Sequence, residues 1–155
     1  MKILYLHGWQ SVPGGVKPTF LEQLGHTLYQ PALPADDFKG AVRIAQAELD
    51  ERHPDSVVGS SRGGAVAMSL IAGDIPLVLL CPAWKRWGGV SAVKPGTLIL
   101  HSLADEVIPF EESRELLRNS GLSESSLIVT GNDHRLADAD SLQALAAALT
   151  AVVDR

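Results

Sequence analysis

The sequence predicts an α/β protein built as a three-layer α/β/α sandwich, with a doubly wound, mostly parallel sheet of about six strands. Two observations predict it. Short apolar runs alternate with helical patterns from one end of the chain to the other, as they do where right-handed crossovers join parallel strands. Many of these runs are also continuously apolar, for example Leu77–Leu80 and Leu127–Val129, which is typical of strands buried on both faces of a sheet.

Six segments have the composition expected of strands, and the second of them has the weakest pattern. They are Lys2–Leu6, Thr27–Gln30, Ser56–Gly59, Pro76–Leu80, Thr97–His101 and Ser126–Thr130. One long stretch, Pro82–Gly96, has no clear pattern and is therefore a candidate for a functional loop, since unpatterned stretches of this length in compact domains tend to be functional.

Five helices are expected between and after these strands. The first begins at Pro18, a residue that suits the start of a helix, and its apolar positions extend to Leu28. The second has apolar residues at helical spacing from Phe38 to Leu49. The third runs from Arg62 to Ala72 and stops at Gly73, the fourth runs from near Pro109 to before Gly121, and the fifth carries apolar residues from Leu142 to Val153.

Length, charge and cysteine content exclude several classes of protein. The 155 residues fit one domain spanning 1–155, without a separate lid. The net charge of −5 is spread as mixed signs, whereas a nucleic-acid-binding protein needs a basic stripe. A single cysteine, Cys81, allows no intramolecular disulfide and argues against a cysteine-based zinc site. No signal peptide and no run of ~20 apolar residues is found, so we expect a cytoplasmic protein that does not bind membranes.

The segment Gly59-Ser60-Ser61-Arg62-Gly63 follows an apolar strand and opens a helix, as the G-x-S-x-G nucleophile elbow does. The serine of an elbow lies at a strained turn, so the residues two before and two after it need to lack side chains. Gly59 and Gly63 meet this requirement. The pattern alone is not specific, because an ordinary glycine-rich turn, including one that binds phosphate, has the same composition.

A catalytic serine needs a base, and the base needs an acid that orients it. After an elbow, the acid and then the histidine follow the serine along the chain. Asp105 comes just after the strand expected at Thr97–His101, and His134 comes just after the one expected at Ser126–Thr130. Both positions lie beyond the carboxyl ends of parallel strands, where such sheets place their sites. Ser61, Asp105 and His134 are therefore the predicted triad.

Other residues remain as alternatives. Glu106 and Asp133 compete with Asp105 as the acid, although Glu106 would point elsewhere in its turn and Asp133 is too close to His134 in sequence to orient it easily. Asp105 itself has the alternative of capping a loop or the following helix. The histidines that compete with His134 are His7, His26, His53 and His101. Those at helix ends, His26 and His53, favour a solvated position, and His101 favours a hydrogen-bonded place in the core.

An acyl-transfer site also needs two donors for the developing oxyanion. One is the backbone N–H of Arg62, the residue after the nucleophile, and the other is expected from the turn after the first strand. That turn is Leu6-His7-Gly8-Trp9, so the Trp9 N–H is the candidate. A plain turn that ends the strand is the alternative interpretation of His7-Gly8.

Together these features resemble the α/β-hydrolase superfamily, and within it the compact bacterial esterases that lack a cap domain. The segments that carry the resemblance are Leu4–Trp9, Gln30–Pro34, Val58–Gly64, Asp105–Pro109 and Gly131–His134, and the likeness covers the whole chain. Two features depart from the family. The antiparallel strands that usually precede the His-Gly strand are missing, which implies six strands. Arg62 stands where many relatives have an apolar residue.

The segments expected to border the site contain His7, Trp9, Trp84 and Trp87. Besides the oxyanion donor Trp9, we consider His7, Trp84 and Trp87 as lining residues of a substrate pocket, because flat aromatic walls suit an acyl chain or an aromatic ester. Trp84 and Trp87 have the alternative of filling the core. Arg62, Lys85 and Arg86 form a basic group that would favour anionic substrates, with a solvated surface pair as the alternative for Lys85 and Arg86.

The resulting hypothesis is a serine hydrolase that cleaves small carboxylic esters through an acyl-enzyme and needs neither a metal nor an organic cofactor. An acyl thioesterase and a small peptidase are alternatives, because pocket shape decides between these substrates. A catalytically silent binding protein with the same frame is the alternative from another class. The expected partner is a small ester or thioester, and the sequence leaves the oligomeric state open.

Overall fold

The computed structural model describes residues 1–154, and its centre is one six-stranded sheet. All neighbouring strands are parallel, in the order β2-β1-β3-β4-β5-β6. The strands are β1 (Lys2–Leu6), β2 (Thr27–Tyr29), β3 (Ser56–Ser60), β4 (Leu77–Leu80), β5 (Leu98–His101) and β6 (Leu127–Val129). The predicted parallel sheet of six strands is thus confirmed.

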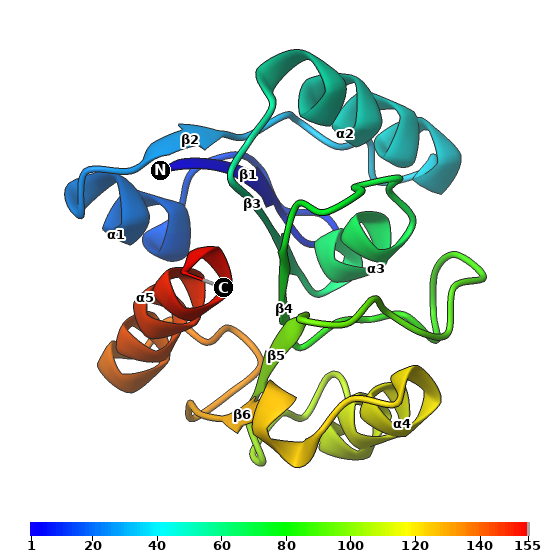
Figure 1. Cartoon of the computed structure of the whole chain (residues 1–155). Coiled ribbons are helices and arrows are strands. Elements are labelled where there is room, and N and C mark those ends of the chain that lie inside the picture. The colour runs from blue at the N-terminus through cyan, green and yellow to red at the C-terminus, as the bar shows by residue number, and fades with distance from the viewer. Residues whose placement is uncertain (155) are drawn as a thin grey trace.

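Helices cover both faces of the sheet (Figure 1). α1 (Val16–Gln23) and α5 (Ala139–Val153) lie on one face, and α2 (Phe38–Arg52), α3 (Arg62–Met68) and α4 (Phe110–Ser120) lie on the other. Each face has its own apolar core, which contains Leu21 and Leu145 on the first side and Ala45, Val66 and Leu116 on the second. These are the three layers that the alternating sequence pattern predicts.

The third helix is shorter than predicted, since it ends at Met68 and not at Ala72. Its last turn tightens, because the N–H groups of Ser69 and Leu70 donate to carbonyls three residues back. The side chain of Gln46 in α2 then both accepts from the N–H of Ile71 and donates to its carbonyl. The backbone groups that would have continued the helix are therefore satisfied by a neighbouring element, which periodicity does not reveal.

The first helix also differs from its prediction. It begins at Val16, so Pro18 lies within its first turn, where a missing N–H costs nothing. It ends at Gln23, and Leu28 belongs to β2. The chain turns at Gly25 with a φ of 87°, a conformation that glycine adopts without steric cost, and this turn separates helix from strand.

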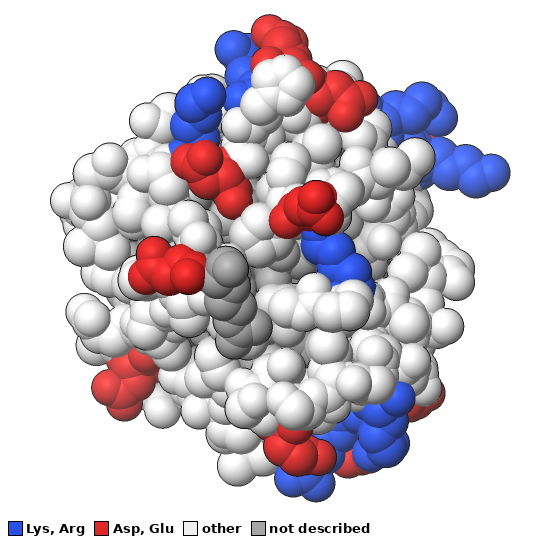
Figure 2. Space-filling view, in the orientation of Figure 1, with Lys and Arg blue, Asp and Glu red and all other residues white. Residues whose placement is uncertain are grey.

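The surface carries charges of both signs. On the face drawn in Figure 2, lysines and arginines are interspersed with aspartates and glutamates. Within residues 1–154, no helix combines the length and the hydrophobicity that crossing a membrane requires.

Candidate functional site

Ser61 lies at the sharp turn between β3 and α3, with φ 55° and ψ −115°. This conformation is rare for a residue with a side chain and is held only where the surroundings fix it. Here the Ser61 N–H donates to the carbonyl of Leu80 at 2.9 Å, and its own carbonyl accepts from Ala83 at 3.0 Å. The turn is thus tied to β4 and to the loop that follows it.

The two glycines of the elbow are required by close packing. A Cβ on Gly59 would lie 2.5 Å from the carbonyl oxygen of Gly63, and a Cβ on Gly63 would lie 2.1 Å from that of Leu6. Strand and helix therefore pass each other at a distance that only glycine allows, as the sequence pattern predicts.

A continuous chain of hydrogen bonds joins the three predicted triad residues. His134 Nε2 lies 3.0 Å from Ser61 Oγ, and His134 Nδ1 lies 2.7 Å from Asp105 Oδ2. Since a carboxylate only accepts, Nδ1 carries the ring proton of the neutral imidazole and Nε2 is free to accept the serine proton. The three residues follow β3, β5 and β6, so the carboxyl ends of three strands bring them together.

Asp105 is held by four hydrogen bonds, and its side chain is fully buried. Oδ1 accepts from the N–H groups of Val107 and Ile108, both at 2.8 Å. Oδ2 accepts from His134 and, at 3.1 Å, from Nε2 of His101. Burial acts to raise the pKa of Asp105, but the hydrogen bonds from Ile108, His134 and Val107 outweigh it and hold that pKa below its usual value. The acid is therefore an anion at neutral pH.

The other candidate acids and bases lie elsewhere. Glu106 is exposed, and the exposed Asp133 accepts from the N–H of Arg135. Both ring nitrogens of His7 bond to backbone, with Nδ1 2.9 Å from the Gly8 carbonyl and Nε2 accepting from the Leu33 N–H. His26 lies beside the N-terminal amine, and His53 ends α2 in an exposed position. Among the described residues, His134 is the one histidine with a hydrogen bond to Ser61.

His101 has a place that the sequence analysis recognised only as part of the core. It is fully buried behind Asp105, and its Nδ1 lies 2.7 Å from the hydroxyl of Ser113. Its Nε2 faces two acceptors, Asp105 Oδ2 and the Ile108 carbonyl, so Nε2 carries the proton. Burial lowers the pKa of His101, which keeps the ring neutral. His101 is thus positioned to fix the carboxylate that orients His134.

We expect His101→Leu to lower kcat/KM for ester hydrolysis by roughly tenfold, because a buried carboxylate loses one of its donors. The acid limb of the kcat/KM profile is expected to move to higher pH, since the less compensated carboxylate attracts a proton onto the neighbouring imidazole more strongly. His101→Gln, which keeps an N–H donor, is the matched control and is expected to restore most of the rate. Unchanged pH profiles in both variants would leave His101 a packing residue.

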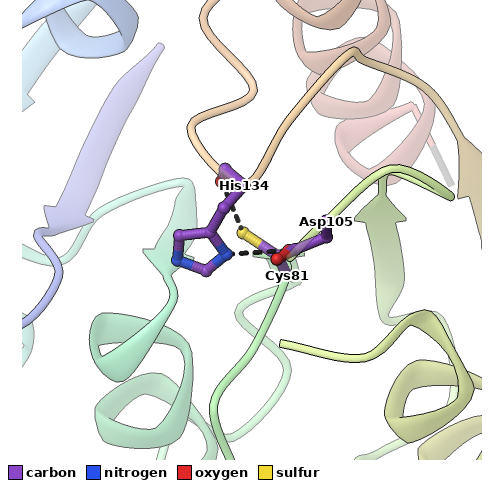
Figure 3. Close-up of side chains that lie close together, drawn as sticks. All are labelled: Cys81, Asp105 and His134. Carbon is purple, nitrogen blue, oxygen red and sulfur yellow. Dashed lines mark hydrogen bonds and ion pairs between the residues drawn. The ribbon is translucent and has the colours of Figure 1, made fainter. Parts of the chain in front are cut away.

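Cys81 is the second nucleophilic side chain near the imidazole, but it faces a different atom. Figure 3 shows its sulfur next to the backbone of His134, and the thiol donates to that carbonyl oxygen at 3.1 Å. Cys81 is fully buried, and burial raises the pKa of its thiol well above the usual value. A protonated thiol turned away from the ring nitrogen is not an activated nucleophile.

Cys81, Asp105 and His134 are also residue types that bind metals, and their ligand atoms lie within 4.8 Å of one another. In the hydrogen bonds already described, Nδ1 carries a proton directed at Asp105 Oδ2, and the thiol carries one directed at the backbone carbonyl of His134. Metal ligands must be deprotonated, so the arrangement fits a hydrogen-bonded cluster and does not fit a metal ion.

We expect Cys81 to resist alkylation by iodoacetamide in the folded protein and to react at an ordinary rate once the chain is unfolded in urea. Mass spectrometry of the alkylated peptide measures both rates. Rapid alkylation of the folded protein with a matching loss of hydrolysis would assign the nucleophile to Cys81 instead of Ser61.

The turn after β1 approaches the elbow closely, as the predicted oxyanion hole requires. A Cβ on Gly8 would lie 3.5 Å from Cβ of Ser61. Within residues 1–154, neither the Trp9 N–H nor the Arg62 N–H donates a hydrogen bond to another backbone group outside the helices and strands. The Arg62 N–H begins α3 directly after Ser61, and the Trp9 N–H follows Gly8 in the turn that approaches the elbow, so both remain the candidate oxyanion donors.

A cavity of about 420 Å³ opens above Ser61 and His134. Two of the predicted pocket residues, His7 and Trp87, line it together with Trp9 and Val107. The rings of Trp9 and Trp87 lie 5.9 Å apart, and Trp9 is half exposed. The cavity therefore has an aromatic wall open to solvent, suited to an apolar part of a ligand.

Trp84 was predicted to line this pocket, and that prediction is wrong. Its side chain is buried in the core beneath α4, where the indole N–H donates to the carbonyl of Glu112 at 3.1 Å. The unpatterned stretch 82–96 thus contributes Arg86 and Trp87 to the cavity, while Trp84 takes the alternative role of a core residue.

The prediction that Arg62, Lys85 and Arg86 form a basic group at the site is also only partly right. The Arg62 side chain is buried away from the cavity between the rings of Phe38 and Trp87, with its Nη2 donating to Pro34. Lys85 forms an ion pair with Glu115. Of the three cations, only Arg86 lines the cavity. Sequence reasoning missed Lys17 and Arg135, which also line it; the position of Arg135 next to His134 was the one signal available.

Comparison of sequences finds no matching family and no similar curated protein. Comparison of structures finds mouse α/β hydrolase domain-containing protein 10 (TM-score 0.74, 17% identity, 99% of this chain and 89% of the other). It also finds Est1E from Butyrivibrio proteoclasticus (TM-score 0.71, 16% identity, 99% of this chain and 85% of the other). A third match is an α-β serine hydrolase homologue from Coxiella burnetii (TM-score 0.68, 18% identity, 99% of this chain and 83% of the other). From its sheet order, its elbow and these similarities, the chain has the fold of the α/β-hydrolases.

Proposed function

We propose that this protein is a serine hydrolase that cleaves carboxylic esters through an acyl-enzyme intermediate. The observation that carries the proposal is the unbroken chain Ser61–His134–Asp105, with distances of 3.0 Å and 2.7 Å, at the floor of a cavity. A hydroxyl, a base that accepts from it and an anion that orients the base are the parts that acyl transfer requires. A protein that only binds ligands has no need for all three.

In the proposed reaction, Ser61 Oγ attacks the ester carbonyl while His134 Nε2 takes the hydroxyl proton. The negative charge that forms on the carbonyl oxygen is stabilised by the N–H groups of Trp9 and Arg62. His134 then gives its proton to the leaving alcohol, and the acyl group stays on Ser61. A water molecule, activated by His134 in the same way, then attacks the acyl-enzyme, which releases the carboxylic acid product and restores the Ser61 hydroxyl. Asp105 keeps the imidazole in the tautomer that both steps need.

The aromatic wall formed by Trp9 and Trp87 supports an ester with an apolar or aromatic part. One structural neighbour, Est1E, has been solved with ferulic acid bound. Thioesters and small peptides carry the same kind of carbonyl, so an acyl thioesterase and a peptidase follow the same mechanism with different leaving groups.

A fluorophosphonate probe tests the proposal directly, because it reacts with an activated serine. We expect labelling of the folded protein at Ser61 and none in Ser61→Ala. Ser56→Ala is the matched control, since Ser56 is a buried serine at the opposite end of β3, and it is expected to label as the parent does. A folded protein that does not label would instead be a catalytically silent binding protein.

The substrate class is tested with nitrophenyl esters, acyl thioesters and peptide amides of matched acyl length. We expect the highest kcat/KM among the oxygen esters. If a thioester is turned over faster than every oxygen ester, the protein is an acyl thioesterase. If an amide is turned over faster than every oxygen ester, it is a peptidase.

A further inference from the structure

We propose that the substrates carry an anionic group next to the ester, which Lys17, Arg86 and Arg135 bind; this inference rests on the proposed hydrolase function. The three cations line the cavity above Ser61. Among the residues that the structure describes, no aspartate or glutamate lines it. A cavity with charges of a single sign selects ligands of the opposite sign.

The three cations keep their charge uncompensated. The Lys17 ammonium donates to the carbonyl of Arg135, and Nη2 of Arg86 donates to that of Val107 at 2.6 Å. Neutral carbonyls orient these side chains without cancelling their charge. Within residues 1–154, no carboxylate forms an ion pair with any of the three.

Several cations outside the cavity form ion pairs with carboxylates. Lys85 pairs with Glu115, Arg52 with Glu48, and Arg118 with Glu111. The protein as a whole has a net charge of −5, and the face in Figure 2 mixes both signs. The cavity lining, with three cations and, among the described residues, no acidic one, thus has the opposite sign of charge to the protein as a whole.

Lys17 has the most desolvated of the three charges. Burial lowers the pKa of its ammonium, and the nearby charge of Arg135 lowers it further, while the carboxylate of the exposed Asp133 raises it. An ammonium that has lost water without gaining a carboxylate gains from a bound anion, because the anion replaces the missing charge partner.

The cations line the same cavity as Ser61 and His134. Arg135 follows His134 directly in the sequence, and Arg86 precedes Trp87 of the aromatic wall. Guanidinium groups suit planar carboxylates and phosphates, which they bind through two parallel hydrogen bonds. The geometry points to an ester with an apolar or aromatic body and a carboxylate or phosphate within reach of these side chains.

Matched pairs of esters test the proposal. Mono-(4-nitrophenyl) glutarate has a carboxylate on its acyl part, and 4-nitrophenyl pentanoate is its neutral counterpart of equal acyl length. 4-Acetoxybenzoate has the carboxylate on the leaving group, and its methyl ester is neutral. We expect kcat/KM to favour the anionic member of at least one pair by roughly tenfold. The pair that responds identifies the side of the ester on which the anion lies.

The ratio of the anionic to the neutral rate separates charge recognition from general damage, because a folding defect lowers both rates. We expect this ratio to fall towards one in Arg86→Gln and Arg135→Gln. It is expected to stay unchanged in Arg114→Gln, whose partner is Glu111 on the surface of α4. Raising the salt from about 0.01 M to about 1 M, which shortens the screening length from roughly 30 Å to 3 Å, should also reduce it.

Equal rates within both pairs, or a ratio that Arg86→Gln and Arg135→Gln leave intact, would overturn the proposal. Calorimetric binding of mono-(4-nitrophenyl) glutarate to Ser61→Ala distinguishes it from the proposed function. If the parent hydrolyses no ester but this variant binds the anionic ester more tightly than the neutral one, the hydrolase assignment fails and the anion site remains.

Discussion

Ser61→Ala is expected to lower kcat for ester hydrolysis by roughly 10⁴- to 10⁶-fold, with little change in KM. The hydroxyl is the atom that bonds to the substrate, and no other side chain lies in its place: the Cys81 thiol donates to a backbone carbonyl. The Trp9 and Arg62 amides and the cavity walls are untouched by the substitution. The residual rate and the unchanged KM are therefore expected to come from binding and from the oxyanion donors.

His134→Ala is expected to lower kcat for ester hydrolysis as much as Ser61→Ala does. The double variant Ser61→Ala/His134→Ala is expected to lower kcat hardly more than either single substitution. The serine and the histidine act as a unit, since the hydroxyl is activated only through the 3.0 Å bond to Nε2. Steady-state kinetics with one nitrophenyl ester measure all three variants. Losses that multiply in the double variant would mean that the two residues contribute independently, contrary to the proposed mechanism.

Gly63→Ala is expected to destabilise the fold by about 3 kcal/mol or more, although it adds a single methyl group. The new Cβ would lie 2.1 Å from the carbonyl oxygen of Leu6 and 2.6 Å from that of His7, both backbone atoms at the end of β1. Backbone in a central strand has no room to move away, so α3 has to shift from the sheet. That shift also displaces the Arg62 N–H, and we expect activity to fall even where the variant still folds.

Urea unfolding followed by circular dichroism measures the change in the free energy of unfolding. Gly89→Ala is the control, because a Cβ at Gly89 meets no atom within 4 Å, and it is expected to change stability by less than about 0.5 kcal/mol. A Gly63→Ala variant as stable as the parent would show that β1 and α3 are not in the close contact described for the elbow.

The sheet and the triad are the parts that the sequence predicts best, and both depend on local chemistry. Apolar runs such as Leu77–Leu80 identify buried strands without any knowledge of their neighbours. Ser61, Asp105 and His134 each follow a strand, and parallel strands necessarily bring their carboxyl ends to one edge. The elbow pattern places glycine on both sides of Ser61 within five residues of sequence, although the backbone that Gly63 has to clear belongs to β1. For the strands and the triad order, local patterns along the chain are therefore sufficient.

Other features depend on contacts between distant segments, and there the predictions are wrong or absent. The end of α3 depends on Gln46 in another helix. Trp84 and Trp87 lie three residues apart, yet one packs under α4 and the other faces the cavity. Lys17 reaches the site from α1. In each case a side chain is directed by what lies opposite it in space, and periodicity contains no information about that partner.

The nucleophile and its base stand on parts of the sheet that differ in resistance to local opening. Ser61 follows β3, whose five residues are all buried between two neighbouring strands. His134 follows β6, a three-residue strand at the edge of the sheet, with Val129 more than half exposed. Edge segments with few buried contacts open at lower free energy than central ones. Amides of β6 are therefore expected to exchange hydrogen before those of β3, and hydrolysis is expected to fade in mild denaturant before the helical signal does.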